Sequence, residues 1–170
     1  MHYLDISFTY KNTDISVREK LAFDSDEKKE QILKLLRSNK NIEECMVLNT
    51  CNRVEIIASV SDLKSATTHA FRCMSIFSGV FEDELYERAD IYEDSGAVHH
   101  LFAVASSLDS LVVGETQIVG QLKNAFKFAY DSSACGEQIS KIIHYACKCA
   151  AKVRNETQIS KNPISVSSVA

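Results

Sequence analysis

The first 93 residues switch repeatedly between two periods of apolar and polar side chains. A period of two residues is typical of strands, and a period of three to four is typical of helices. The pattern predicts strands at about 2–10, 44–49, 53–60 and 89–92, and helices at about 15–23, 25–38 and 62–78. The helix at 25–38, capped by Asp24 or Ser25, is expected to bury Ile32, Leu35 and Leu36.

From Ser95 onward the pattern is helical, and Ser95 is a plausible N-cap. Three apolar stripes follow: Val98, Leu101, Phe102, Ala105 and Leu108; then Ile118, Leu122, Ala125, Phe126 and Ala129; then Ile139, Ile142, Ile143, Ala146, Ala150 and Val153. A turn is expected at Cys135 and Gly136. The predicted fold class is α+β: a small sheet-and-helix sandwich (ferredoxin-like) over about 1–93, followed by a helical subdomain over about 95–158. Residues 159–170 are expected to begin a linker.

Composition argues against a membrane-spanning or a secreted protein. The chain has 170 residues, 45% of them hydrophobic, and no apolar run approaches the roughly 18 residues of a membrane span. The first ten residues lack the features of a signal peptide, so a cytoplasmic protein without membrane contact is expected. The six cysteines include no Cys-x-x-Cys pair, and we expect neither disulfides nor a metal.

The charge is unevenly distributed. The net charge is −4, which argues against binding of nucleic acid over the whole surface. The basic excess lies after residue 110, where Lys141, Lys148 and Lys152 are spaced to share one helical face. This face is either a solvated helix surface or a modest phosphate-contacting stripe.

The strongest chemical signal is Cys51, which lies in a polar break between two strand-like segments. Thr50 and Asn52 flank it, and Arg53 follows two positions later. In an extended chain Cys51, Arg53 and Glu55 share one face. A nearby cation favours the thiolate, which is the nucleophilic form of cysteine. The pattern therefore favours an activated thiol over a packing residue.

Other candidates for chemistry lie in the helical part. His99 and His100 point about 100° apart on one helix, so at most one faces a given site. The segment 108–117 combines polar groups with Gly114 and reads either as a helix–turn–helix or as a recognition loop. No Gly-x-Gly-x-x-Gly fingerprint of a dinucleotide site occurs. From the pattern alone, a thiol acyl-transfer enzyme and a binding module both remain open.

Longer motifs add a family resemblance. They are the segment 48–55 (LNTCNRVE), the segment 97–102 (AVHHLF), the segment 104–118 (VASSLDSLVVGETQI) and the segment 164–170 (ISVSSVA). Together, in this order, they resemble the amino-terminal catalytic domain of glutamyl-tRNA reductase. That enzyme makes glutamate-1-semialdehyde for tetrapyrrole (porphyrin) biosynthesis. The resemblance runs through the whole chain.

The resemblance implies an oxidoreductase in which Cys51 attacks the ester of glutamyl-tRNA, and NADPH then reduces the resulting thioester. Splitting the reaction at a thioester suits a tethered thiol. His100 matches the family's active-site histidine. The positions implied to bind the glutamate are Thr50, Arg53, Ser110, Glu115 and Gln121. The alternative is a non-catalytic domain that binds tRNA or a protein.

The resemblance also implies partners. NADPH would be bound by a further domain that is absent from this chain and that residues 159–170 lead toward. The complete protein would be a homodimer through an absent carboxy-terminal domain, and the downstream glutamate-1-semialdehyde aminomutase would be a partner. Two positions depart from the family pattern: Ala103 stands where arginine is common, and Ser107 where glycine is common.

Overall fold

A single antiparallel sheet organises the chain. The computed structural model describes residues 1–108 and 117–157. Its strands are β1 (His2–Thr9), β2 (Ile42–Asn49), β3 (Arg53–Val60) and β4 (Asp90–Glu93), in the order β2-β3-β1-β4. β2 and β3 form a hairpin, whereas β1 lies between β3 and β4. With helices following β1 and β3, this order is the ferredoxin-like arrangement, so the predicted fold class is confirmed.

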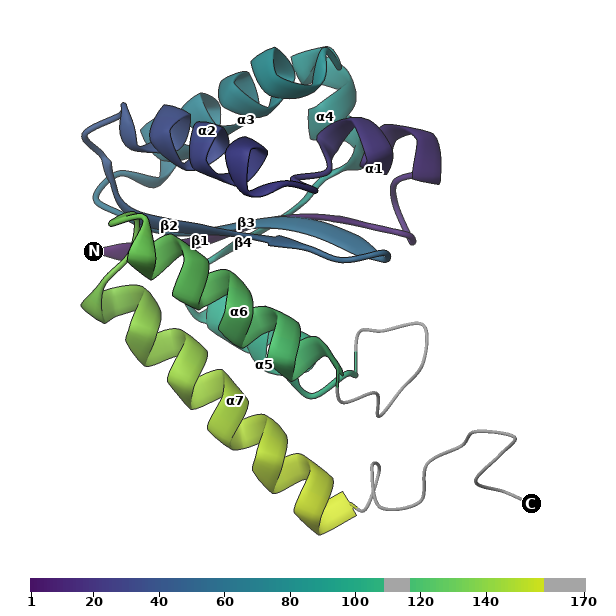
Figure 1. Ribbon diagram of the computed structural model, residues 1–170, viewed down its shortest axis with the longest axis vertical. Coiled ribbons are helices and arrows are strands. Elements are labelled where there is room, and N and C mark those ends of the chain that lie inside the picture. Colours follow the sequence, from purple (N-terminus) through teal and green to yellow (C-terminus); the bar gives the residue numbers. More distant parts are fainter. Residues whose placement is uncertain (109–116, 158–170) are drawn as a thin grey trace.

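Four helices cover one face of the sheet (Figure 1). They are α1 (Ile15–Leu21), α2 (Asp26–Arg37), α3 (Leu63–Ser78) and α4 (Glu82–Arg88). Local signals set their ends: the Ser25 hydroxyl accepts a hydrogen bond from the Lys28 amide, and Asp62 caps α3 in the same way. Gly79 ends α3 with a φ of 77°, which a side chain would disfavour. The sequence pattern did not indicate α4.

The buried face of α2 differs from the expected one. Ile32, Leu33 and Leu36 are buried, whereas Leu35 is 37% exposed. The prediction for Leu35 was therefore wrong. The helix turns Leu33 toward β2, where the Leu33 carbonyl accepts a weak hydrogen bond from the Cys45 thiol. The buried arc is therefore centred nearer to Leu33 than the apolar spacing alone indicated.

Three helices cover the opposite face (Figure 1). They are α5 (Ser95–Ala105), α6 (Gln117–Asp131) and α7 (Glu137–Thr157), and their buried side chains join one core cluster with those of the first layer. The predicted cap at Ser95 was wrong, because Asp94 is the N-cap residue, with a φ of 49°. Leu108 was also misplaced, since it is 53% exposed. None of the described helices has the length and apolarity to cross a membrane.

The first turn of α7 is tied to the edge strand β2. Both carboxylate oxygens of Glu44 accept hydrogen bonds from backbone amides at this turn, at 2.6 Å from Gly136, 3.1 Å from Gln138 and 3.0 Å from Ile139. A carboxylate at a helix N-terminus satisfies unpaired amides and complements the helix dipole. The turn predicted at Cys135 and Gly136 is therefore fixed to the sheet by one side chain.

Candidate functional site

The face of the sheet that α5 covers carries a buried layer of polar side chains. Because strand side chains alternate, the odd-numbered residues of β1 and β3 point to this face, and the even-numbered ones point to the first helical layer. The buried polar residues on these strands are Asp5, Ser7, Thr9, Arg53, Glu55 and Ser59. The register places Thr9 opposite Arg53 and Ser7 opposite Glu55. The sequence thus builds a polar layer inside an otherwise apolar core.

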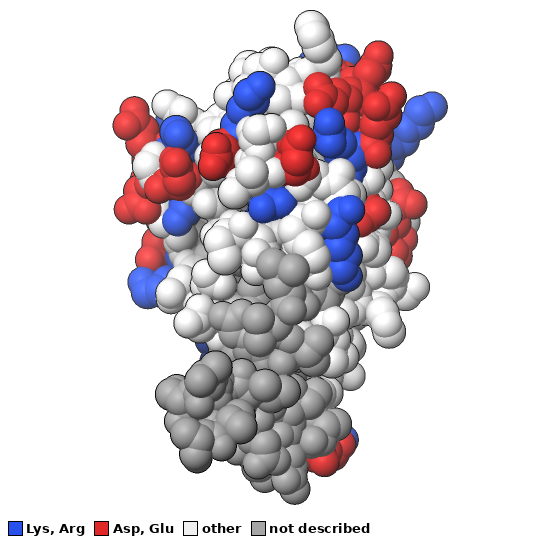
Figure 2. All heavy atoms as spheres, turned by 90° about the vertical axis from the view of Figure 1, so that its right-hand side faces the viewer, with Lys and Arg blue, Asp and Glu red and all other residues white. Residues whose placement is uncertain are grey.

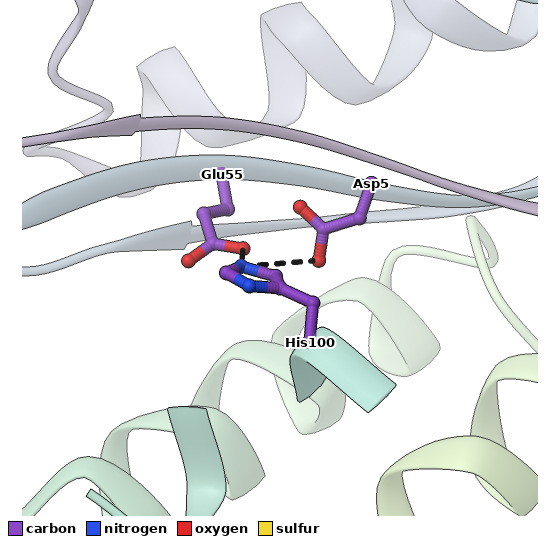
Figure 3. Close-up of side chains that lie close together, drawn as sticks. All are labelled: Asp5, Glu55 and His100. Carbon is purple, nitrogen blue, oxygen red and sulfur yellow. Dashed lines mark hydrogen bonds and ion pairs between the residues drawn. The ribbon is translucent and has the colours of Figure 1, made fainter. Parts of the chain in front are cut away.

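Glu55 is the centre of this layer. One of its oxygens pairs with the Arg53 guanidinium, and the other lies 2.9 Å from Nε2 of His100, which reaches in from α5. A carboxylate oxygen of Asp5 lies 4.0 Å from the same nitrogen. Figure 3 shows both carboxyl groups beside one nitrogen of the imidazole ring. The ring also stacks on Tyr92, with ring centroids 4.0 Å apart. The imidazole is therefore held by contacts with three strands.

The pKa values of the two carboxyl groups, Glu55 and Asp5, are shifted in opposite directions. Burial by itself raises the pKa of Glu55, but the hydrogen bond and charge of His100 outweigh it. With further help from a hydrogen bond with Asp5 and from the charge of Arg53, they hold that pKa at about 2. Burial raises the pKa of Asp5 well above its usual range, and the charge of Glu55 raises it further. At neutral pH, Glu55 is therefore ionised, while the site favours a protonated Asp5.

Cys51 lies outside this layer, at the turn between β2 and β3. The Thr50 hydroxyl accepts hydrogen bonds from the amides of Asn52 and Arg53, both at 3.2 Å, and the Thr50 amide donates to the Arg53 carbonyl at 2.9 Å. The Tyr10 amide adds a bond to the Asn52 carbonyl. A short turn closed by these four hydrogen bonds therefore presents Cys51 to solvent.

Exposure distinguishes Cys51 from the other five cysteines, which are buried or half-buried. Burial raises the pKa of Cys45 and of Cys135 to about 12, and it also raises the pKa of Cys73 and Cys147. Such thiols stay protonated at neutral pH and do not act as nucleophiles. Of the cysteines, Cys51 is therefore the one that a large substrate can reach.

Arg53 and Thr50 are committed to the protein itself. The Arg53 side chain is 1% exposed, and its guanidinium points into the polar layer toward Glu55. The expected pairing of Arg53 with a substrate carboxylate stays a prediction, and so does its influence on the Cys51 thiol. The Thr50 hydroxyl shapes the turn through its two accepted hydrogen bonds.

Of the remaining predicted residues, Gln121 lies among the described ones. Gln121 is exposed on α6, and Ser110 and Glu115 lie outside the described residues. His99 is exposed and lines, with His100 and Tyr92, an open pocket of about 660 Å³. Ser107 has a φ of 60°, a left-handed conformation that favours the glycine common at this position in the family it resembles.

Two residues of the polar layer were missed as functional candidates. Asp5 stands out as an acid within an apolar, alternating strand, and Glu55 continues the face of Arg53. With His100 they place three potential metal-ligand atoms within 4.8 Å of one another. Carboxylate and imidazole groups suit several divalent metals. Nε2 of His100 and Glu55 are, however, already at direct hydrogen-bond distance.

The basic face predicted on α7 is partly neutralised. Lys141, Lys148 and Lys152 are all exposed, but Lys141 pairs with Glu137 at 3.2 Å and Lys152 lies 3.9 Å from Glu156. Figure 2 shows the end of the molecule that carries the β2–β3 turn: charged side chains of both signs gather in its upper part, over the first helical layer. The solvated-surface interpretation accounts for the two paired lysines.

Comparison with known proteins identifies the family. A family model described as "Glutamyl-tRNAGlu reductase, N-terminal domain" matches residues 6–157. The chain is 91% identical over 170 residues to the glutamyl-tRNA reductase of Campylobacter concisus (strain 13826) and 82% identical to that of Campylobacter curvus (strain 525.92). In each case the match covers all of this chain and 40% of the relative, so the chain spans about two fifths of these relatives' length.

A solved structure agrees with this assignment. The glutamyl-tRNA reductase from Methanopyrus kandleri superposes with a TM-score of 0.76 at 28% sequence identity. The superposition covers 96% of this chain and 37% of that one. Sequence and fold give the same answer: the chain belongs to the family of glutamyl-tRNA reductase N-terminal domains.

Proposed function

We propose that this chain carries out the acyl-transfer half of the glutamyl-tRNA reductase reaction. The Cys51 thiolate attacks the carbonyl carbon of the ester that joins glutamate to the terminal ribose of its tRNA. A carbon–sulfur bond forms, the carbon–oxygen bond to ribose breaks, and the ribose oxygen leaves with the electron pair and takes up a proton. The products are a glutamyl thioester on Cys51 and free tRNA.

The observation that carries this proposal is the exposure of Cys51 on a turn closed by four hydrogen bonds. A nucleophile that must meet an ester on a large RNA needs access, and it also needs a fixed position. The turn supplies the fixed position, because four backbone or hydroxyl hydrogen bonds close around it. The family membership is the second support, since the relatives are named as glutamyl-tRNA reductases.

His100 supplies the proton that the leaving ribose oxygen needs. Its imidazole hydrogen-bonds an ionised Glu55, an arrangement in which a carboxylate orients a histidine for acid–base work. Because both carboxyl groups face Nε2, the other ring nitrogen, Nδ1, is the one that exchanges a proton with substrate. The proposed contacts of the glutamate remain Thr50, Arg53, Ser110, Glu115 and Gln121.

Reduction of the thioester needs a hydride donor, and NADPH supplies a hydride when bound. The sequence contains no Gly-x-Gly-x-x-Gly phosphate-binding loop, so we place the NADPH site outside these 170 residues. The residues of this chain then serve to hold the thioester at Cys51. We expect the isolated chain to form the thioester without completing the reduction.

Mass spectrometry of the chain after mixing with glutamyl-tRNA tests the proposal. The wild type should gain one glutamyl group on Cys51, and hydroxylamine should remove it, as expected of a thioester. Cys51→Ser should gain no such hydroxylamine-labile group. Cys147→Ser is the matched control, because Cys147 is half-buried with a raised pKa, and this variant should react like the wild type.

Either of two results would contradict the proposal: a glutamyl group on another residue, or an unchanged adduct in Cys51→Ser. The rate at which iodoacetamide alkylates Cys51 distinguishes a catalytic domain from the alternative, a non-catalytic binding domain. A thiol that reacts no faster than free cysteine at neutral pH would favour binding without catalysis.

A further inference from the structure

Asp5 is the ionisable residue of the polar layer to which the proposed transfer reaction gives no role. Its side chain has no exposed surface, and its ionised form has no hydrogen-bond donor among the described residues, whereas its protonated form hydrogen-bonds Glu55. A buried carboxyl group is costly unless it is paired or protonated. One of its oxygens nevertheless lies 4.0 Å from Nε2 of His100, on the same side of the ring as Glu55. The placement of a buried carboxyl group this close to His100 therefore needs a physical explanation.

The charges around His100 are unequal. β1 contributes Asp5, and β3 contributes Arg53 and Glu55, which pair with each other. β4 contributes the Tyr92 ring, and the exposed His99 is the neighbour on α5 itself. The buried side chains of α6 and α7 are apolar: Ile118, Leu122, Ala129, Ile139, Ile142, Ile143, Ala146 and Ala150. Asp109 and Glu115 lie outside the described residues.

These groups leave the layer one negative charge in excess when both carboxyl groups are ionised and His100 is neutral. One added proton removes the excess. It has two sites: the carboxyl group of Asp5, or Nδ1 of His100, because Nε2 already donates to the ionised Glu55. The first site leaves a neutral imidazole, and the second creates an imidazolium beside an ionised Asp5. In both arrangements the net charge of the layer is zero. The low-dielectric surroundings favour these two arrangements over any that carries a net charge.

We propose that Asp5 is a positioning residue for His100: the two groups share one dissociable proton, and the ionised Asp5 stabilises the imidazolium that protonates the departing ribose oxygen. This inference rests on the proposed transfer function. The Nδ1 proton moves to the ribose oxygen as the carbon–oxygen bond breaks, which leaves a neutral imidazole and an ionised Asp5. A proton from water then restores the starting state. Atoms and charges balance without any oxidant or reductant.

Infrared spectroscopy of the wild-type chain, with carbon-13 in its aspartate carboxyl groups, tests the shared proton without substrate. At neutral pH the wild type should show the carbonyl band of one protonated aspartate. Asp5→Asn should lack this band. Ser7→Ala should keep it. It is a matched control because Ser7 is also buried on β1 and faces the same layer, and its hydroxyl has no hydrogen-bond partner in the part of the chain that the structure describes. A wild type without this band would overturn the assignment of Asp5.

The pH dependence of Cys51 acylation tests the positioning role. Asparagine keeps the shape and neutrality of protonated Asp5 but cannot take a negative charge. Single-turnover acylation of Asp5→Asn should be about tenfold slower at pH 7, because the imidazolium then lacks a neighbouring negative charge, and a tenfold loss corresponds to about 1.4 kcal/mol. The deficit should shrink as the pH falls, because the solvent then supplies the proton that Asp5 otherwise helps to hold in the site. Ser7→Ala should follow the wild-type profile.

Three results would overturn the inference. If Asp5→Asn lost the same fraction of its acylation rate at every pH, Asp5 would have a merely structural role. If its pH profile matched that of the wild type, Asp5 would have no role in the reaction. One tightly bound divalent metal ion, found by elemental analysis and lost in Asp5→Asn, would mean that the carboxyl groups hold a cation in place of a proton. A missing glutamyl adduct on the wild type would remove the transfer function, whereas a missing infrared band with a normal adduct would remove only the role of Asp5.

Discussion

The two faces of the central sheet differ in chemistry although they use the same strands. On the face toward α1–α4, β1 and β3 present Leu4, Ile6, Phe8, Val54, Ile56, Ala58 and Val60, all buried. On the face toward α5–α7 the same strands present an acid, a hydroxyl or a guanidinium at nearly every position, and these are equally buried. One residue along a strand separates the two environments.

This difference separates stability from chemistry. Apolar burial stabilises in proportion to area and needs no particular partner. A buried ion pair contributes little net stability, and it becomes costly when one partner is lost. The apolar face therefore stabilises the fold, while the polar face fixes the protonation and orientation of His100. Substitutions on the two faces should have different signatures.

The largest effect is expected for Glu55→Gln. This variant leaves the Arg53 guanidinium buried beside a neutral amide, so the free energy of unfolding should fall by about 3–5 kcal/mol. Acylation of Cys51 should fall as well, since His100 loses its orienting carboxylate. Denaturant titration measures the first effect. Glu43→Gln is the control, because Glu43 is exposed on β2. A folded Glu55→Gln chain of wild-type stability would contradict the role assigned to this pair.

Ile56→Ala probes the apolar face one residue away. Ile56 is 1% exposed, and truncating such a side chain in a core costs about 2–5 kcal/mol of unfolding free energy. At a temperature where the variant is fully folded, Cys51 should be acylated at the wild-type rate. Ile91→Ala, at a site 40% exposed, should lose less stability. Loss of acylation in folded Ile56→Ala would show that the two faces are not separable.

The pH dependence of stability distinguishes the two acids of the polar face. The pKa of Asp5 is raised by folding, so its contribution is fully present below the unfolded pKa and is lost as the pH rises through the folded pKa. The stability of the wild type minus that of Asp5→Asn should therefore decline with rising pH, by about 1.4 kcal/mol for each unit of pKa shift. Thermal unfolding from pH 4 to 9 measures this difference.

Glu55 should show the opposite slope. Its folded pKa of about 2 lies below the unfolded value, so its contribution is present above the unfolded pKa and is lost as the pH falls toward 2. A wild type minus Asp5→Asn difference that rises with pH would contradict the assignment of a raised pKa to Asp5.

The smallest effect is expected for Ser59→Ala. The Ser59 hydroxyl is buried on the polar face, and its oxygen has no hydrogen-bond partner among the described residues. Removing an unsatisfied hydroxyl should raise the unfolding free energy by about 1 kcal/mol without changing acylation. Calorimetry detects a change of this size as a higher midpoint. A loss of stability would indicate that the hydroxyl is satisfied in solution.

The secondary structure was largely predictable because each element carries its own period. The alternation at 2–10 and 53–60 became β1 and β3, and Ser25, one of the two caps expected for α2, is its N-cap. The helix α4 escaped prediction because it is short and buries one side chain, Leu85. Leu35 was misassigned because a helix with several adjacent leucines has more than one possible buried arc.

The site was predictable only where its signal is local in the chain. Cys51 could be found because its polar neighbours and its position between two strands are contiguous. The group of Asp5, Glu55 and His100 could not be found, because it joins three elements through strand register and helix packing. The sequence period indicates which face of the sheet a strand residue occupies, but it does not indicate which residue of a covering helix packs against it.

The bonds that Glu44 makes to the first turn of α7 also have a mechanical consequence. α7 has 21 residues and rises about 1.5 Å per residue, so its far end lies roughly 30 Å from this anchor. A tilt of about 10° at Glu44 would displace that end by roughly 5 Å, following from the same length. The Glu44 carboxylate, together with the Tyr3 hydroxyl that donates to the Gln138 carbonyl and the packing of α7 on α5 and α6, therefore holds the start of a long lever. Any tilt permitted at this start is largest near Thr157.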